Sequence, residues 1–150
     1  MAPVGPVGPA GPSVSAYARN IASPTVPVGE ANAITVESLT LAVTAASRIV
    51  VTGASSMQNS SVTSTDNATA FCALEKDDGS GFAIFGTPAI YTVPFDGDAT
   101  LTNSYGSGAE VGSFVFGPGT VAIRQRCYAA DGSSSLTHWY SSLSAVATGT

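Results

Sequence analysis

Residues 33–43 read Ala-Ile-Thr-Val-Glu-Ser-Leu-Thr-Leu-Ala-Val, and this stretch decides the fold class. Within it, Leu39, Leu41 and Val43 fall on one face of an extended chain, with a threonine and an alanine between them on the other. A period of two is typical of a β-strand, because successive side chains of a strand point to opposite sides. After a short turn, residues 48–53 form a second apolar, β-branched run, so the two segments predict a pair of strands.

The rest of the chain continues this succession of short apolar runs and turn residues. Asp-Gly and Gly-Pro-Gly sequences separate the runs, and no segment has a helical period with caps. Further strands are expected over 68–74, 82–85, 89–93, 99–103, 110–116, 120–129 and 136–146, while residues 55–67 read as a polar loop with at most a short strand around Val62. About eight to ten antiparallel strands predict an all-β fold, a β-sandwich or a barrel.

The chain carries few charges. Charged residues make up 10% of its 150 residues, against about 25% in an average soluble protein. Ten acidic and five basic residues give a net charge of −5. The basic residues are scattered apart from Arg124 and Arg126, so no basic stripe would attract nucleic acid. The longest apolar run is far short of the roughly 20 residues of a membrane-spanning helix. We therefore expect neither a nucleic-acid nor a membrane partner.

The N-terminus has a different composition. Residues 1–13 read Met-Ala-Pro-Val-Gly-Pro-Val-Gly-Pro-Ala-Gly-Pro-Ser, with glycine at every third position from Gly5 to Gly11 and proline after each glycine. This is the Gly-X-Y pattern of the collagen triple helix, in which only glycine fits at the shared axis. One interpretation is a polyproline arm that pairs in threes or docks on a partner, and the other is a flexible linker.

Residues 14–32 lead from this arm into the strands. Pro24, Pro27 and Gly29 exclude a long helix there and favour short extended pieces. The sequence therefore predicts an extended Pro/Gly-rich arm and linker over residues 1–32 and a β-sandwich domain over 33–150.

A collagen-like stretch followed by a small β-domain rich in glycine, serine and threonine resembles phage and bacterial collagen-like surface proteins. In these, a collagen-like or polyproline stalk carries a trimeric jelly-roll head similar to the tumour-necrosis-factor-like fold. The matching segments are residues 3–13 for the stalk, 39–44 and 47–52 for an opening strand pair, and 141–147 for a final strand. The resemblance implies a jelly-roll-like head and, together with the three-chain logic of Gly-X-Y, a homotrimer.

Because the stalk is short, the chain looks most like a phage capsid decoration, cement or head-fibre protein on the outer surface of the virion. The implied partners are its own copies and the major capsid protein or another virion protein. The expected attachment residues are Pro3, Gly5, Pro6, Gly8, Pro9, Gly11, Pro12, Tyr17 and Arg19. The alternative is the receptor- or carbohydrate-binding head of a phage tail fibre or of a bacterial collagen-like filament at the cell surface, with a cell-surface glycan as its partner.

The first residues carry no signal peptide, because they lack a basic start and an apolar helical stretch. With Met1 as the initiator, we expect synthesis in a cytoplasm without export by the usual route. A phage virion protein, which leaves its host by lysis, fits this expectation.

The chain has two cysteines, Cys72 and Cys127, each in the middle of an expected strand and on its apolar face. Two such residues form either a disulfide or a pair of small buried thiols. A disulfide would contribute roughly 2–4 kcal/mol. A structural zinc site needs four ligands, and one histidine with no Cys-x-x-Cys pair does not supply them. No cofactor is expected.

Other polar residues favour structural roles. His138 is the single histidine and lies beside Trp139 and Tyr140, with no Gly-x-Ser-x-Gly elbow in the chain, so we expect a strand or interface residue. Arg124 and Arg126 share one face of a strand. They are expected to lie on a solvated face, to form inter-subunit ion pairs, or to bind an anion. The acidic turns 77–79 and 96–98 match no EF-hand loop and are expected to be plain turns.

The aromatic residues leave two interpretations open. Aromatic side chains in a β-sandwich serve as core or subunit contacts, or they form an exposed surface on which sugars stack. The residues in question are Tyr91, Tyr105, Tyr128, Trp139 and Tyr140. Neither a cluster of acids nor a triad suggests catalysis, so we do not expect an enzyme.

Overall fold

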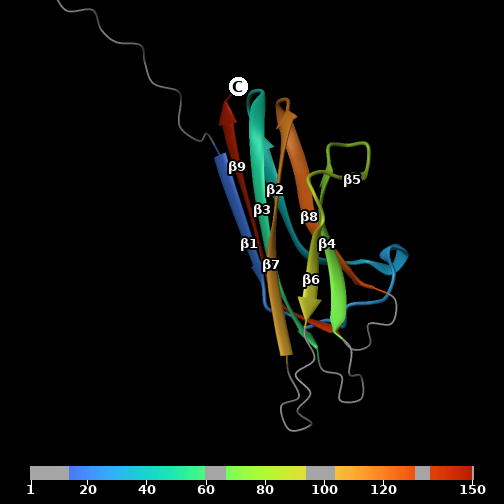
Figure 1. Cartoon of the computed structure of the whole chain (residues 1–150). Coiled ribbons are helices and arrows are strands. Elements are labelled where there is room, and N and C mark those ends of the chain that lie inside the picture. The colour runs from blue at the N-terminus through green and yellow to red at the C-terminus, as the bar shows by residue number, and fades with distance from the viewer. Residues whose placement is uncertain (1–13, 60–66, 94–103, 131–135, 150) are drawn as a thin grey trace, which may run out of the picture.

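A computed structural model of the chain describes residues 14–59, 67–93, 104–130 and 136–149, which form a sandwich of two antiparallel β-sheets (Figure 1). Sheet A has the strand order β1-β9-β3-β7, with β1 Val14–Asn20, β9 Leu136–Gly149, β3 Ser47–Asn59 and β7 Ser104–Phe116. Sheet B has the order β2-β8-β4, and both β5 and β6 pair with β4. Its strands are β2 Ile34–Val43, β8 Gly119–Ala129, β4 Ala68–Asp77, β5 Phe82–Ile84 and β6 Ala89–Val93. The predicted all-β sandwich is confirmed at this level.

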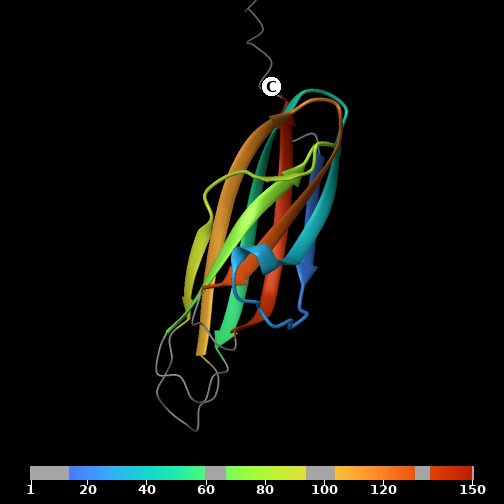
Figure 2. The ribbon, with the colours of Figure 1, turned by 90° about the vertical axis from the view of Figure 1, so that its right-hand side faces the viewer.

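The alternation of side chains places the core between the sheets. In β3 every second residue from Ser47 to Asn59 is buried, and β8 follows the same pattern from Val121 to Ala129. The core has two apolar clusters along the sandwich, one around Met57, Tyr91 and the cysteines and the other around Leu41 and Ile49. Figure 2, turned by 90°, shows the strands of both sheets running roughly along the long axis of the sandwich.

Cys72 of β4 and Cys127 of β8 lie directly opposite each other in the register of sheet B and form a disulfide. Their Cα atoms are 4.2 Å apart, and both residues are at most 1% exposed. The apolar faces on which the sequence placed them are therefore the inner face of sheet B. The bond lies within sheet B and links positions 55 residues apart in the chain.

The expectation of a polar loop from residue 55 is wrong for its first five residues. Strand β3 continues to Asn59, paired with β7 on one side and β9 on the other. Ser55 and Asn59 point inward although they are polar, so the hydrophobic alternation that marks a strand is hidden here. Val62, the expected centre of a short strand, lies outside the described residues.

The N-terminal boundary also differs from the sequence-based prediction. Residues 14–20, assigned to the arm and linker, form β1, which pairs with β9 from Val14↔Ala147 to Asn20↔Ser141. Inward and outward residues alternate in this segment, but the inward residues are mostly small. The sequence pattern of a strand is therefore weak here. The sandwich therefore begins at Val14, and residues 21–33 run along one end of it.

Helical structure in the described ranges is limited to the single 3-10 turn η1, Glu30–Asn32. The described residues contain no helix with the length and apolar character needed to cross a membrane. Strand β1 begins, and β9 ends, at the same end of the sandwich (Figure 1). Residues 1–13 therefore join the domain at the end where β9 finishes.

Candidate functional site

The outward-facing side of sheet A, here called the sheet A face, is the main candidate for an interaction surface. It carries two charged residues, Arg19 and Arg48, and none of its described residues is acidic. The chain as a whole has a net charge of −5, so this face differs from the rest of the surface. Its other described members are uncharged: Ser15, Tyr17, Val50, Thr52, Ala54, Ser56, Gln58, Tyr105, Ser107, Ala109, Val111, Ser113, Val115, Thr137, Trp139, Tyr140, Ser142, Ser144, Val146 and Thr148.

One end of this face carries four exposed valines, which we call the valine patch: Val50 of β3, Val111 and Val115 of β7, and Val146 of β9. Val50 lies directly opposite Val146, and Val146 lies opposite Ser15 of β1. The patch is therefore level with the start of β1, where residues 1–13 join the sandwich. Serine and threonine side chains lie between the valines, and Arg48 of β3 lies directly opposite Val115 at the edge of the patch.

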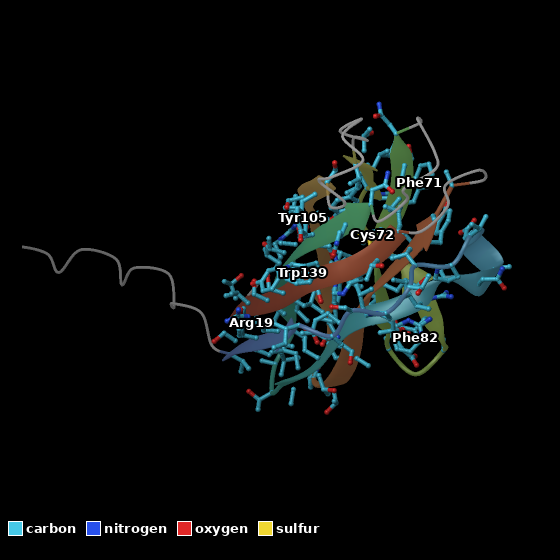
Figure 3. All side chains as sticks on the ribbon, turned by 90° about the horizontal axis from the view of Figure 1, so that it is seen from below. Arg19, Phe71, Cys72, Phe82, Tyr105 and Trp139 are labelled. Atoms are coloured by element: carbon cyan, nitrogen blue, oxygen red, sulfur yellow. A yellow bond between two sulfur atoms is a disulfide. The ribbon has the colours of Figure 1, made fainter. Side chains whose placement is uncertain are left out.

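The other end of the sheet A face is hollowed into an open groove of about 610 Å³, which we call the aromatic groove. Its walls are Arg19, Ile21, Ser23, Ser56, Trp139 and Tyr140. Figure 3 shows Arg19, Trp139 and Tyr105 on one side of the sandwich and Phe71 and Phe82 on the other. Tyr105 meets the Trp139 ring edge to face at 5.9 Å, and the Arg19 guanidinium lies 5.2 Å from the centre of the Tyr140 ring.

A β-bulge in β9 explains why two neighbouring aromatic residues share this face. Ser56 of β3 pairs with Tyr140 and the next residue, Met57, pairs with His138, so Trp139 is the extra residue. Without the bulge, alternation would turn either Trp139 or Tyr140 into the core. With it, His138 and Ser141 point inward and both aromatic rings point outward. Bulges re-aim side chains in this way beside many functional sites.

His138 holds one wall of the groove in place. Its buried ring donates from Nδ1 to the carbonyl oxygen of Ala22 at 3.1 Å, and its backbone N–H donates to that of Pro24 at 2.9 Å. Ile21 and Ser23, which line the groove, flank Ala22. Burial lowers the pKa of His138, so the ring is neutral at neutral pH. The predicted structural role therefore takes the form of a core residue that fixes the segment after β1.

The two zones are separated along β9. Val146 and Tyr140 are six residues apart, or roughly 20 Å at the rise of an extended strand. Tyr17 and Arg19, predicted attachment residues, lie on β1 beside the groove, where a hydrogen bond with Tyr140 raises the pKa of Tyr17. The other predicted attachment residues, Pro3, Gly5, Pro6, Gly8, Pro9, Gly11 and Pro12, lie outside the described residues.

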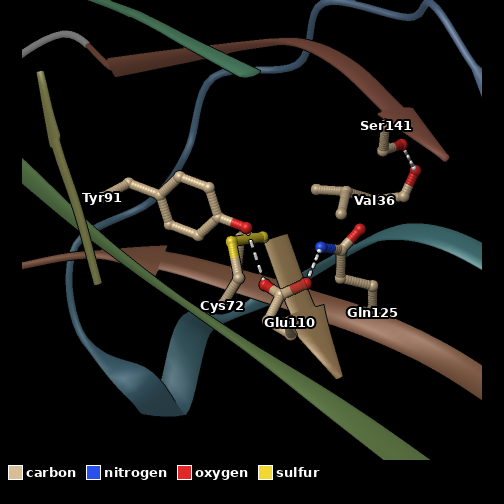
Figure 4. The surroundings of a disulfide bond; sticks show 7 residues. Val36, Cys72, Tyr91, Glu110, Gln125 and Ser141 are labelled. Carbon is tan, nitrogen blue, oxygen red and sulfur yellow. Dashed lines mark hydrogen bonds between the residues drawn. A yellow bond between two sulfur atoms is a disulfide. The ribbon is translucent and has the colours of Figure 1, made fainter. Parts of the chain in front are cut away.

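A buried polar cluster, here called the Glu110 network, links the two sheets. The Tyr91 hydroxyl of β6 donates to Oε1 of Glu110 in β7 at 2.8 Å, and Nε2 of Gln125 in β8 donates to Oε2 at 2.6 Å. All three residues are at most 3% exposed. Burial raises the pKa of Glu110, and burial together with the Glu110 charge raises the pKa of Tyr91. Figure 4 shows the network beside the disulfide.

Glycines make the room that this network needs. A β-carbon on Gly53, which pairs with Glu110, would lie 2.6 Å from Oε2 of that residue. A β-carbon on Gly108 would lie 2.6 Å from the Tyr91 ring. Neither the network nor its glycines followed from the sequence, because Glu110 and Gln125 occupy inward positions where an apolar residue is the rule.

The remaining predicted residues divide between the core and sheet B. Tyr91 is buried in the Glu110 network, and Tyr128 stacks on Phe71 at 5.2 Å on the outer side of sheet B. Of the five aromatic residues considered as one surface, only Tyr105, Trp139 and Tyr140 therefore meet. Of the two interpretations left open, a single exposed surface of all five does not apply, because Tyr91 is a core residue and Tyr128 lies on the other sheet.

Arg124 and Arg126 share the outer face of β8 as expected, and both pair with Glu75 within the same chain, at 2.6 and 3.4 Å. Arg124 also stacks on the Phe82 ring at 3.5 Å. In the acidic turn after β4, Asp77 accepts hydrogen bonds from the backbone N–H groups of Gly79 and Gly81, as in an ordinary turn. Residues 96–98 lie outside the described part of the chain.

The sheet A face offers exposed valines beside Arg48 at one end and aromatic, hydroxyl and guanidinium groups at the other. Within the described ranges, no three His, Cys, Asp or Glu side chains come together as metal ligands would. No protein-family model matches this chain, and no curated protein matches it.

Proposed function

We propose that this chain is a structural protein of a virion, a homotrimeric capsid decoration or head-fibre protein held to the particle by its N-terminal arm. The observation that carries the proposal is the valine patch, which lies level with the start of β1 on a face whose described residues include no acidic side chain. Contiguous exposed apolar surface of this kind marks protein–protein contact. The role is assembly rather than catalysis.

The strand order supports a jelly-roll head. Sheets of order β1-β9-β3-β7 and β2-β8-β4-β6 bring together strands that are far apart in the sequence. In each sheet the first and last parts of the chain lie next to each other, as they do when two Greek keys are wrapped into a double sheet. Strand β5 is a short addition at one edge.

Self-association through the valine patch agrees with the charges. Each copy carries a net charge of −5, and repulsion between copies is smallest where acidic groups stay out of the contact. The valines supply apolar contact area, and a hollow of about 530 Å³ beside Val50 and Val111, lined also by Arg48, can receive side chains of a neighbouring copy. A three-fold arrangement around this end of the sheet would also bring three Gly-X-Y stretches together, as a collagen-type pairing requires.

The arm supplies attachment in this proposal. Residues 1–13 precede Val14 directly, and the aromatic groove lies at the opposite end of sheet A. A head anchored through the arm would then project its groove end away from the particle, and Arg19, a predicted attachment residue, would not contact the particle. Surface buried between the arm and the capsid would stabilise the particle by mass action, since it exists only in the assembled state.

The attachment is tested by co-sedimentation with particles that lack this protein. The full chain should sediment with the particles, and a chain lacking residues 1–13 should stay in solution with an unchanged far-ultraviolet circular dichroism spectrum. Full decoration by the truncated chain would contradict attachment through the arm. Antibodies against the sandwich should label the outer surface of virions, and labelling of bacterial cells alone would favour the cell-surface alternative.

A further inference from the structure

We propose that the aromatic groove is a binding site for a saccharide that carries a carboxylate. This inference concerns the end of sheet A opposite the valine patch, and it depends on neither trimer formation nor virion attachment. Three features of the groove support it: an exposed aromatic platform, a guanidinium without an acidic partner among the described residues, and two serine hydroxyl groups on the walls.

The platform consists of Trp139, with the Tyr105 ring in a T-shaped contact at 5.9 Å. The Trp139 side chain is half exposed, although an indole ring is large and mostly apolar. The bulge places it outward, and the edge-to-face contact with Tyr105 fixes its orientation. A half-exposed indole ring offers apolar surface to solvent, which suits the apolar face of a pyranose ring. At this point of β9 the residue that packs into the core is His138, not Trp139.

Arg19 supplies the charge. In the described part of the chain it forms no ion pair, and the lining of the groove contains no acidic side chain. Glu37 of β2 acts electrostatically on Tyr17 and Tyr140 but does not line the groove. The stacking on Tyr140 holds the guanidinium in position at the groove wall. A planar guanidinium fixed beside an aromatic platform is suited to bidentate contact with a carboxylate.

Two serine hydroxyl groups are the third feature of the groove. Ser56 accepts a hydrogen bond from the Ser107 hydroxyl at 3.0 Å, so its own O–H is free to donate into the groove. Ser23 also lines the groove, on the segment held by His138. The groove volume of about 610 Å³ lies within the roughly 300–1,000 Å³ range of small-molecule sites. Such sites usually combine an apolar surface with a small number of polar groups.

The chain itself contains the probe for a test, because Trp139 is its only tryptophan. The full chain is titrated with 3′-sialyllactose, with lactose as the matched neutral sugar and with trigalacturonate as a second acidic one, and the tryptophan fluorescence is followed. We expect saturable changes with the acidic sugars, and binding of sialyllactose about ten-fold tighter than that of lactose, as a charge-assisted contact provides.

Arg19→Gln should remove this ten-fold preference, while Arg48→Gln, which removes the other arginine of the same face, should leave it unchanged. Thermal unfolding of both variants shows whether they remain folded. Equal affinity for sialyllactose and lactose, or equal effects of the two substitutions, would overturn the assignment of Arg19. No fluorescence change with either acidic sugar would overturn the site itself, including the case in which a second copy covers the groove.

Discussion

The Tyr91 hydroxyl of sheet B donates a 2.8 Å hydrogen bond to the Glu110 carboxyl of sheet A, across the interior of the sandwich. Gln125 donates to the other carboxyl oxygen, so a glutamate that is 3% exposed has both oxygens occupied. The interaction joins β6, β7 and β8, which come from both sheets. Because buried polar groups are stable only when they are paired, this contact sets the separation and register of the two sheets at this point.

The stability of the protein should depend on pH through Glu110. Its pKa is raised above the ordinary value of 4.5, so the folded state holds this proton more tightly than the unfolded chain does. The resulting stabilisation is present below pH 4.5 and is lost as the pH rises through the folded-state pKa. In Glu110→Gln this dependence is absent. We expect the free energy of unfolding of the wild type to fall relative to that of the variant as the pH rises above 4.5.

Urea denaturation of both proteins at several pH values measures this difference. His138, whose pKa is lowered, destabilises both proteins equally below pH 6.5, so its effect cancels in the comparison. A difference that stays constant across the pH range would mean that Glu110 titrates as in the unfolded chain.

Tyr91→Phe should leave Oε1 of Glu110 buried without its donor. An unpaired buried acceptor costs about 1–3 kcal/mol. Tyr105→Phe removes the same hydroxyl from a tyrosine that is 48% exposed, and its effect should be close to zero. Urea denaturation of the two variants gives both values, and equal effects would show that the Tyr91 hydroxyl has no special role.

The disulfide should resist reduction until the protein unfolds, because both cysteines are at most 1% exposed. Treatment of the native protein with a reductant should produce no reactive thiol. The same treatment in urea should produce two. Replacing both cysteines by alanine should lower the free energy of unfolding by roughly 2–4 kcal/mol. Rapid labelling of thiols in the reduced protein without denaturant would contradict the buried position.

Gly108→Ala should destabilise the fold, because its β-carbon would lie 2.6 Å from the Tyr91 ring. Overpacking of this kind costs about 1–3 kcal/mol. Gly117→Ala is the matched control, since a β-carbon there meets nothing within 4 Å. Thermal unfolding should therefore shift for the first variant and stay nearly unchanged for the second.

The sequence was sufficient for the features that follow from apolar alternation. Strands β2, β4, β6, β8 and β9 are found where the pattern placed them, although β4 and β9 extend further than expected. The pattern failed where small or polar residues face inward. Strand β1, the second half of β3 and the first half of β7 all have such residues, among them Ala16, Ser55 and Gly108.

The candidate site was foreseen only in part. Arg19, Trp139 and Tyr140 were singled out from the sequence, but nothing in it places Ile21, Ser23 and Ser56 beside them. Their proximity depends on the strand order β1-β9-β3 and on a bulge, and neither is encoded in local periodicity. The Glu110 network was missed for a similar reason, because its members lie on three strands that meet only in the folded chain.

The central proposal, assembly through the valine patch, is tested most directly by the molar mass in solution. Val111→Lys places a charge in the patch, and Ile90→Lys places the same charge at an equally exposed position on sheet B, the two residues being 64% and 66% exposed. Light scattering should give three times 14.9 kDa for the wild type and for Ile90→Lys, and a smaller mass for Val111→Lys. A trimer that survives Val111→Lys, or a wild type that is monomeric, would contradict the proposal.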